Sequence, residues 1–547
     1  MQQFQSPLEA FLYWEANIPA SNFLIQHTNE NSIIYTYESA GIEIRKIAAA
    51  LKSYNLADRS HVALLSKNCA HWVMADLAIM MAGHVSIPIY PTLNARTIEL
   101  LLDHSESKAI IIGKLDNYAS QRSGIKEMHK ISVGLHGGTE GDLWEDLVNK
   151  MEPINSIYPL RAEDLLTIIY TSGTTGTPKG VMHTAGNMMI SARTFFAISG
   201  LSINQRAFSY LPLAHVAERA GIEIGSLNGG ASMSFPHSLE TFASDLEKTQ
   251  PNLFFAVPRI WAKFQEKILE SLPQKKLDIL LKIPIVNGII RYKLKQKLGL
   301  KEAIFVCSGA APLAPSLINW FGKLNITIHQ VYGMTEDCII SHSNHEGANK
   351  VGTVGKPQNG VKSKLSPEGE ICIKNNCLMK GYYKAPDITA SVFDEQGYLK
   401  TGDIGEYDHD GFLTITGRIK DQFKTDKGKY ISPAPIELSL SGNKYIEQIC
   451  LVGTGIPQPI ALITLSELGK AKSKQDITQS LSESISSVNP KLEKHEKVEK
   501  AVIMSEEWNV DNGLTTPTLK LKRNSIEKLH QDRYASWFES EDQVIFE

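Results

Sequence analysis

The sequence predicts an α/β protein with a large multi-sheet N-terminal body and a smaller C-terminal domain. Strand-like apolar runs alternate with helix-like segments up to about residue 400, and 547 residues exceed a single typical domain. Glycine and acidic turn residues then crowd together in Gly397–Gly417, and the chain beyond them is more charged. We therefore expect two domains, residues 1–417 and 418–547.

The elements of the body are expected in alternating order. A helix is predicted over Ile42–Leu56, followed by a strand over Val62–Leu65. Further strand-like runs occur at Ala109–Ile112, Leu165–Thr171, Ala303–Cys307 and Glu370–Ile373. Helical segments separate many of these runs, which favours parallel strand pairing.

Two segments bear on membrane contact. Ile268–Lys301 interleaves lysine with leucine and isoleucine, which predicts a pair of solvated amphipathic helices. Basic amphipathic helices also lie on membrane surfaces, so that alternative stays open. The most apolar window, Trp72–Tyr90, contains Asp76, His84 and Pro88 and is not expected to span a bilayer.

Composition and charge exclude several classes of protein. The hydrophobic content of 42% and the charged content of 21% are those of an ordinary globular protein. A formal net charge of -3 gives no reason to expect a nucleic-acid partner. The six cysteines form no disulfide framework, which favours a reducing cytoplasm. Peripheral contact with the inner membrane face stays open.

A loop rich in small and hydroxyl residues, YTSGTTGTPKG at Tyr170–Gly180, follows an apolar strand-like run. Small residues allow close backbone approach, hydroxyl and N–H groups donate to anionic oxygens, and Lys179 adds a positive charge. The loop is not a GxxxxGK[ST] P-loop, because Gly180 follows Lys179. We predict a phosphate-binding loop, with a surface turn as the alternative. Its binding residues are Thr171, Ser172, Gly173, Thr174, Thr175, Gly176 and Lys179.

Three later segments occur in a fixed order: VYGMTE at Val331–Glu336, GYLKTGDIG at Gly397–Gly405 and GRIKDQFK at Gly417–Lys424. With the loop, they make the sequence resemble the acyl-adenylate-forming superfamily of acyl-CoA synthetases, luciferases and peptide-synthetase adenylation domains. The resemblance implies a body of helix-flanked sheets with a small barrel-like part, and a compact α+β C-terminal domain. It also implies ATP, Mg²⁺ and coenzyme A as reactants.

The resemblance assigns nucleotide-binding roles that suit the chemistry of the residues. The carboxylate of Glu336 suits Mg²⁺, and Thr335 beside it joins the catalytic set. Tyr332, with Gly333, offers a flat face to adenine, and the small-residue turn after Ala303–Cys307 resembles the family's adenine-binding segment. That turn contributes Ser308, Gly309 and Ala310. Without the surrounding VYGMTE segment, a lone glutamate such as Glu336 would more often be a surface charge.

Asp403 can accept hydrogen bonds from both ribose hydroxyls, and Arg418 can donate to ribose or phosphate oxygens. Turn formation is the alternative role of Asp403, because Gly-Asp is common in turns. The resemblance places the interdomain hinge at Lys420, where the C-terminal domain rotates between the two half-reactions.

The implied reaction begins when a carboxylate attacks the α-phosphorus of ATP and expels pyrophosphate, a step that needs positioning and cations. Lys520, within TTPTLKLKR at Thr515–Arg523, is aligned with the family's catalytic lysine. The glycine that usually precedes that lysine is Leu519 here, and Lys522 lies two residues away as the alternative.

Three segments resemble the long-chain and very-long-chain fatty acyl-CoA synthetase branch: LPLAHVAER at Leu211–Arg219, AVPRIWAKF at Ala256–Phe264 and KTDKGKYISPAPIE at Lys424–Glu437. Gly230 lies in a glycine-rich stretch that could line an acyl tunnel or allow tight helix–sheet packing. His215 is expected to position the acyl group, with a structural histidine as the alternative.

Three functions remain open. The first is a long-chain fatty acyl-CoA synthetase that uses a fatty acid, ATP and coenzyme A. The second is an adenylating ligase that delivers the acyl group to a carrier protein, and the third is a non-catalytic AMP-binding relative. The full set of predicted site residues argues against the third function. The second function ranks below the first, because the chain has no extra segment before Arg418. The oligomeric state is not predicted.

Overall fold

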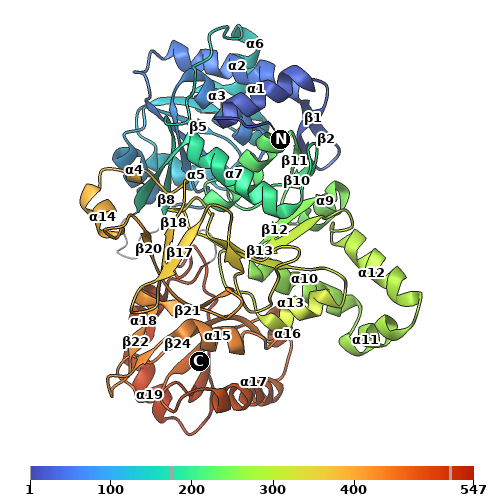
Figure 1. Ribbon diagram of the computed structural model, residues 1–547, viewed down its shortest axis with the longest axis vertical. Coiled ribbons are helices and arrows are strands. Elements are labelled where there is room, and N and C mark those ends of the chain that lie inside the picture. Colours follow the sequence, from blue (N-terminus) through green and yellow to red (C-terminus); the bar gives the residue numbers. More distant parts are fainter. Residues whose placement is uncertain (1, 172–177, 517–519) are drawn as a thin grey trace.

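The computed structural model describes residues 2–171, 178–516 and 520–547 (Figure 1). An N-terminal body contains two large mixed sheets and a small antiparallel sheet, and a C-terminal domain lies below it in the view of Figure 1. A pair of helices projects from the side of the body as an arm. The predicted fold class is confirmed.

The first large sheet has eight strands in the order β19-β9-β8-β4-β3-β5-β6-β7. Pairs from β8 to β7 are parallel, as expected, whereas β8–β9 and β9–β19 are antiparallel. In chain order its strands are β3 (His61–Leu65), β4 (Val85–Ile89), β5 (Ala109–Ile112), β6 (His129–Ser132), β7 (Asp142–Leu143), β8 (Leu165–Thr171), β9 (Lys179–Thr184) and β19 (Gly381–Tyr382).

The second large sheet has nine strands in the order β16-β15-β14-β13-β12-β10-β11-β1-β2. Its parallel centre runs from β14 to β1, and its two edges are antiparallel. In chain order its strands are β1 (Asn22–His27), β2 (Ser32–Thr36), β10 (Arg206–Phe208), β11 (Ser232–Phe235), β12 (Leu253–Ala256), β13 (Phe305–Ser308), β14 (His329–Tyr332), β15 (His342–Ser343) and β16 (Lys356–Pro357).

Helices cover and separate these sheets. The helices of the body are α1 (Pro7–Asn17), α2 (Tyr37–Ser53), α3 (Ala70–Ala82), α4 (Ala95–Ser105), α5 (Tyr118–Gln121), α6 (Trp144–Lys150), α7 (Ala185–Ser199), α8 (Gly225–Gly229), α9 (Phe242–Thr249), α10 (Pro258–Ser271), α11 (Gln274–Lys282), α12 (Val286–Lys297), α13 (Pro315–Gly322) and α14 (Pro386–Ser391). A π-helix, η3 (Ala217–Ile224), precedes α8.

Two predicted elements shift for local reasons. α2 begins at Tyr37, five residues before the predicted start, because Thr36 caps it through a capping box with Ser39. The apolar window at Trp72–Tyr90 contains α3, whose residues are all buried in the core that joins the two large sheets. The apolar character of the window is therefore explained by its burial in the protein core. Among the described residues, no helix combines the length and the apolar character that crossing a membrane requires.

The small sheet is antiparallel, with the order β17-β18-β20-β21. Its strands are β17 (Lys362–Leu365), β18 (Glu370–Lys374), β20 (Leu399–Tyr407) and β21 (Leu413–Arg418). The last strand ends at Arg418, one residue past the expected end of the first domain, and the short helix η4 (Ile419–Asp421) follows it.

The C-terminal domain is built on the four-stranded sheet β24-β25-β26-β27, with a short β22–β23 hairpin. Side chains alternate along β24: Ile449 and Leu451 face the α15–α17 side, whereas Cys450 and Val452 face the α18–α19 side. Its elements are β22 (Phe423–Lys424), β23 (Tyr430–Ile431), α15 (Pro433–Leu440), β24 (Ile446–Val452), β25 (Ile460–Leu465), α16 (Glu467–Lys470), α17 (Lys474–Val488), β26 (Lys500–Ile503), α18 (Arg523–His530), α19 (Tyr534–Glu539) and β27 (Val544–Phe546).

The domains meet through α10. The Nε of Arg259 lies 2.5 Å from Oε1 of Glu447. The backbone N–H of Leu468 donates to Oε1 of Glu266 at 3.2 Å. These contacts bring the C-terminal domain against the same side of the body as the small antiparallel sheet (Figure 1).

The core of the body contains an ionic network, which we call the buried acidic network: Asp76, Arg219, Glu218 and Glu223. Arg219 donates to both carboxylate oxygens of Asp76 at 2.7 Å and to Thr167 at 2.6 Å. All four charged residues are essentially inaccessible to solvent. Burial and the Asp76 charge raise the pKa of Glu223 well above its usual range, and Oε2 of Glu223 lies 3.7 Å from Nε of Arg219.

Candidate active site

The ends of the predicted phosphate loop are fixed by an antiparallel hairpin. Thr171 ends β8 and is paired with Lys179, the first residue of β9. The ammonium of Lys179 lies 5.2 Å from the centroid of the Tyr382 ring, a distance at which a cation is attracted to the ring face. The other predicted loop residues lie outside the described residues: Ser172, Gly173, Thr174, Thr175 and Gly176.

Tyr382 links the hairpin to the predicted magnesium ligand. Its hydroxyl donates to Oε1 of Glu336 at 2.7 Å, and strand β19 places it beside Val181 of β9. The carbonyl oxygen of Thr335 accepts a hydrogen bond from Nε2 of His183 at 2.7 Å. Burial lowers the pKa of His183 to about 4, so this histidine is neutral at pH 7.

The turn that carries Glu336 is tightly folded. A Cβ at Gly333 would lie 2.6 Å from backbone atoms of Ile339, so glycine is required there. Cys338 and Ile339 both have positive φ values, of 54° and 64°, and this conformation is rare for a β-branched residue. Such strain is concentrated at functional sites.

One acidic side chain of the turn is held by the backbone. Asp337 accepts a hydrogen bond from the Met334 N–H at 2.9 Å. Burial and the neighbouring Glu336 raise the pKa of Asp337 well above its usual range. Asp337 is fully buried, whereas Glu336 is 8% exposed, so Glu336 is the acidic side chain of this turn that can reach a ligand.

The predicted ribose site is formed by neighbouring strands. Asp403 of β20 and Arg418 of β21 are directly paired in register. Arg418 Nε donates to Asp403 Oδ1, and the Tyr332 hydroxyl donates to Oδ2, both at 2.7 Å. Each carboxylate oxygen keeps a second lone pair, so Asp403 can still accept from a ribose hydroxyl.

The predicted adenine segment lies beside Tyr332, because β13 pairs with β14 through Ser308 and Gln330. A Cβ at Gly309 would lie 2.9 Å from a Val331 methyl group, so this position also requires glycine. Ala310 has a φ of 67°, which turns the chain sharply after the strand. The Ser308 hydroxyl is buried and has no partner within the described parts of the chain.

Lys520 comes from the C-terminal domain but lies in the electrostatic environment of the body site. Desolvation and the Arg418 charge lower its pKa, whereas Asp403 and Glu336 raise it. The residue is nevertheless exposed to solvent and does not belong to a core. Lys522, the alternative, occupies the N-cap of α18.

The predicted acyl-site residues lie in different surroundings. Burial and the Lys520 charge lower the pKa of His215 to about 3, so His215 is neutral and lies near Lys520. Its Nδ1 accepts a hydrogen bond from the Ala217 N–H at 3.2 Å. Gly230 instead ends α8 with a φ of 62°, and a Cβ there would lie 2.7 Å from the Trp14 ring. The nearest side chain to Gly230 is thus that of Trp14, a residue of the hydrophobic core.

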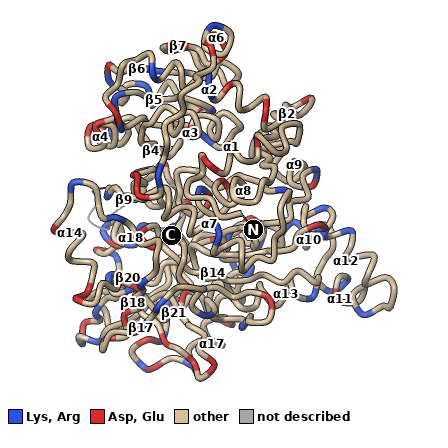
Figure 2. Tube along the Cα trace, turned by 45° about the horizontal axis from the view of Figure 1, so that its top comes forward, with Lys and Arg blue, Asp and Glu red and all other residues tan. Residues whose placement is uncertain are grey.

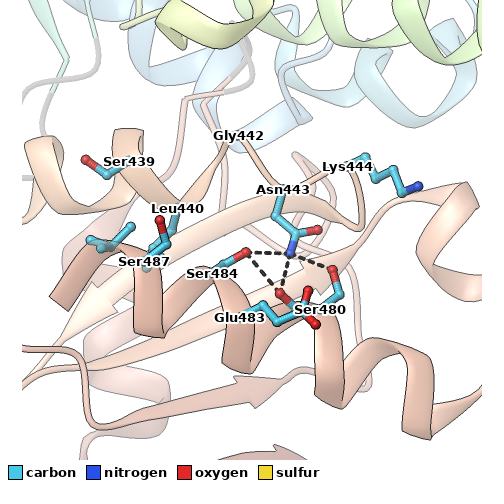
Figure 3. A pocket seen from close by; sticks show the side chains of 10 residues that line it. Ser439, Leu440, Gly442, Asn443, Lys444, Ser480, Glu483, Ser484 and Ser487 are labelled. Carbon is cyan, nitrogen blue, oxygen red and sulfur yellow. Dashed lines mark hydrogen bonds between the residues drawn. The ribbon is translucent and has the colours of Figure 1, made fainter. Parts of the chain in front are cut away.

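A separate hollow of about 390 Å³ lies on the C-terminal domain between α15 and α17 (Figure 3). The amide nitrogen of Asn443 donates to Ser480 O, Ser480 Oγ and Ser484 Oγ, at 2.9 to 3.1 Å. These polar groups are hydrogen-bonded to one another. None of the predicted site residues lines the hollow.

Within the described chain, no group of three or more His, Cys, Asp or Glu side chains is arranged to hold a metal ion. Glu336 Oε1 accepts a hydrogen bond from the Tyr382 hydroxyl. A single carboxylate suits Mg²⁺ only when phosphate oxygens complete its coordination.

Comparison with family models bears directly on this arrangement. The model for AMP-binding enzymes matches residues 16–383. The chain belongs to this family of AMP-binding enzymes. The model for the AMP-binding enzyme C-terminal domain matches residues 420–542. The predicted family membership is confirmed.

Curated relatives of this AMP-binding enzyme match it along most of its length. Long-chain-fatty-acid–CoA ligase FadD15 of Mycobacterium bovis is 28% identical over 555 residues, covering 91% of both chains. Long-chain-fatty-acid–CoA ligase 5 of Rattus norvegicus is also 28% identical, over 89% of this chain and 81% of the relative.

Solved structures show the same fold at lower identity. The anthranilate CoA ligase AuaEII in complex with anthranoyl-AMP superimposes with a TM-score of 0.80 at 20% identity, covering 98% of this chain and 99% of that one. The adenylation domain of a carboxylate reductase from Mycobacterium chelonae gives 0.79 at 20% identity, covering 98% and 91%.

Two polar residues of this site were missed from the sequence, Tyr382 and His183. Tyr382 lies in a two-residue strand and His183 in an edge hairpin, and neither position has a distinctive pattern of neighbours. Their roles depend on pairing between strands that are far apart in the chain. The Gly-Tyr-Tyr sequence at 381–383 was the one available signal, and turns share it.

Proposed function

We propose that this enzyme activates a long-chain fatty acid with ATP and transfers it to coenzyme A. In the first half-reaction a carboxylate oxygen bonds to the α-phosphorus of ATP, and the bond from that phosphorus to pyrophosphate breaks. In the second, the coenzyme A thiol adds to the acyl carbon and AMP leaves. The proposal makes the enzyme an AMP-forming acid–thiol ligase.

One observation carries the proposal: Lys520 of the C-terminal domain lies among Arg418, Asp403 and Glu336 of the body. Charge builds up on the phosphate oxygens as the carboxylate attacks, and preorganised cations lower the energy of that state. Lys520 and Arg418 supply two such cations, and Lys179 is a third at the end of the phosphate loop. Thr335 is proposed to complete the catalytic set beside Glu336.

No general base is required in the first half-reaction, because a fatty acid is already ionised at neutral pH. The low pKa of His215 agrees with this, since a neutral histidine beside Lys520 adds no competing charge. We assign His215 a positioning role for the acyl carboxylate. We keep Gly230 as a proposed lining residue of the acyl tunnel, although its closeness to the Trp14 ring supports a role in packing instead.

Glu336 would hold Mg²⁺ together with ATP phosphate oxygens, and the ion would neutralise phosphate charge. Tyr332, Gly333 and the Ser308–Ala310 turn are proposed to hold adenine, and Asp403 the ribose. The proposed domains are residues 1–417 and 418–547. Lys420, which follows the last strand of the body, is proposed as the hinge on which the C-terminal domain rotates before thiolation.

Long-chain fatty acids are proposed because the curated relatives named above are long-chain-fatty-acid–CoA ligases. The proposed setting is the cytoplasm, with small molecules as partners and peripheral contact at the inner membrane face.

The test is pyrophosphate release from purified protein with ATP and Mg²⁺, using fatty acids of increasing chain length, with and without coenzyme A. Turnover that peaks with long chains and requires coenzyme A supports the proposal. A single burst without coenzyme A, followed by turnover on an acyl-carrier protein, would assign the carrier-protein ligase instead. Absence of release with every acid would leave a non-catalytic AMP-binding protein.

A further inference from the structure

The helical arm formed by α11, α12 and their connection carries apolar side chains on two opposite faces. The inner face packs on the body, where Leu277 is buried and Leu294 and Leu298 are partly buried in the core around Trp261. Trp320 Nε1 donates to Gln274 Oε1 at 2.8 Å and fixes the start of the arm. An amphipathic surface helix needs only this one apolar face.

The outer face is also apolar. Five of the 17 large hydrophobic side chains that are exposed in the described chain lie within the 14 positions from 279 to 292. We call them the apolar tip: Ile279, Ile283, Ile285, Ile289 and Tyr292, with exposed fractions from 41% to 80%. Single exposed hydrophobic residues are ordinary, but such a cluster indicates an interaction surface.

The backbone at the end of the arm holds one of these side chains in solvent. Ile285 precedes α12 with φ 68° and ψ −51°, an outlier for a β-branched residue, and it is 80% exposed. Glycine or asparagine would fit that turn with less strain. The turn geometry therefore does not explain why isoleucine occupies the position.

The apolar tip is surrounded by positive charge. Residues 274–301 contain one acidic residue, Asp278, and eight basic residues, a net charge of +7 in a chain whose net charge is −3. The basic residues are Lys275, Lys276, Lys282, Arg291, Lys293, Lys295, Lys297 and Lys301. Figure 2 shows basic segments along α11 and α12, on an arm that projects away from the body.

We propose that this arm docks on the surface of an anionic lipid bilayer, with the apolar tip at the boundary between head groups and acyl chains. Exposed lysines beside apolar side chains are the pattern of helices that lie in the membrane interface. At nine and twelve residues, α11 and α12 are too short to cross a bilayer. The docking deepens the peripheral contact included in the proposed function.

The charge of the arm favours an anionic bilayer over a second copy of this chain and over another protein as its partner. A second copy of the chain would bring together two arms that each carry a net charge of +6 over residues 274–297, and they would repel each other. The cores of protein–protein interfaces are depleted in lysine, whereas five lysines of the arm are exposed. These are Lys275, Lys276, Lys282, Lys293 and Lys297.

The experiment is co-sedimentation of the full-length protein with phosphatidylcholine vesicles that contain or lack phosphatidylglycerol. One variant removes the apolar tip (Ile283→Ser, Ile285→Ser, Ile289→Ser), and a second removes charge (Lys275→Gln, Lys276→Gln, Lys282→Gln, Lys293→Gln). The matched controls change exposed residues elsewhere: Ile34→Ser with Ile203→Ser and Ile388→Ser, and Lys427→Gln with Lys472→Gln, Lys491→Gln and Lys494→Gln.

We expect the wild type and both controls to bind the anionic vesicles, and each arm variant to bind at least tenfold more weakly. Binding should fall at high salt, because part of it is electrostatic. Wild-type protein that stays in the supernatant, or arm variants that bind like the controls, would overturn the proposal. Self-association lost only in the tip variant would assign the surface to a second copy.

Vesicle binding is measured without substrate, so it is independent of the proposed catalytic function. Pyrophosphate release with a detergent-dispersed fatty acid should be unchanged in both arm variants. A protein that binds vesicles but releases no pyrophosphate would refute the catalytic proposal and leave the docking proposal standing. An unchanged thermal unfolding midpoint shows that the arm variants are folded.

Discussion

Two arginine–aspartate pairs in this enzyme share the same short distance but lie in opposite environments. Arg219 and Asp76 are 2.7 Å apart, with both side chains fully buried. Arg418 and Asp403 are also 2.7 Å apart, but the Arg418 side chain is 46% exposed and Asp403 is 9% exposed. Distance alone therefore does not distinguish a structural pair from a binding pair.

The difference lies in what surrounds each pair. The carboxylate of Asp76 accepts two hydrogen bonds from Arg219, and Glu223, whose pKa burial raises, is buried in the same network. Asp403 and Arg418 instead lie near Lys520, which belongs to another domain and keeps solvent access. A buried pair that loses a partner leaves an uncompensated charge, whereas an accessible pair keeps capacity for a ligand.

The largest expected effect is on the buried acidic network. Asp76→Ala should lower the free energy of unfolding by about 3–5 kcal/mol, because Arg219 is then left buried without its charged partner. Urea unfolding followed by tryptophan fluorescence measures this loss. The matched substitution in the accessible pair, Asp403→Ala, should cost less, because the half-exposed Arg418 keeps its hydration when its partner is lost. Equal losses in the two variants would contradict the contrast between the pairs.

The next largest effect concerns the lysine that completes the accessible site. Lys520→Ala should slow acyl-adenylate formation by about 10²–10³-fold, the cost of removing one preorganised group that stabilises transition-state charge. ATP–pyrophosphate exchange measures this step. Thioester formation from supplied acyl-adenylate should survive, and Lys522→Ala is the neighbouring control. Exchange lost in the control but kept in Lys520→Ala would reverse the assignment.

A smaller effect is expected from Asp403→Asn. The substitution keeps the shape of the side chain but loses the charge that attracts Arg418 and an acceptor for ribose. Hydrogen bonds to charged groups contribute about 1.5–3 kcal/mol, so the KM for ATP should rise by roughly 10- to 100-fold. Initial rates at varied ATP concentration test this, with the unfolding midpoint as the control. An unchanged KM would remove Asp403 from the nucleotide site.

The last prediction is a pH dependence of stability from the buried acidic network. Burial raises the pKa of Glu218 to about 8, although the Tyr210 N–H donates to its carboxyl group at 2.9 Å. The folded state therefore holds this proton more tightly than the unfolded state, and its stabilising contribution declines as pH rises from about 5 to 8. Glu218→Gln should flatten that decline, as measured by unfolding midpoints across the range. A slope equal to that of the wild type would exclude Glu218 as its source.

The sequence by itself determined the α/β body, the smaller C-terminal domain and the family. Strand runs such as Ala109–Ile112 and Leu165–Thr171 match β5 and β8 residue for residue, because hydrophobic patterning is local. The site motifs could be recognised because each is a short continuous segment. These segments supplied every residue of the cluster around Asp403 and Glu336 except Tyr382 and His183.

Only the tertiary structure decided which charges meet. Asp76 interrupts an apolar window, and nothing local indicates that Arg219 lies opposite it across the core. Tyr382 reaches Glu336 through the pairing of β19 with β9, and Lys520 comes within electrostatic range of Arg418 through the packing of two domains. Contacts between residues far apart in the chain depend on the whole packed fold, so local sequence patterns leave no trace of them.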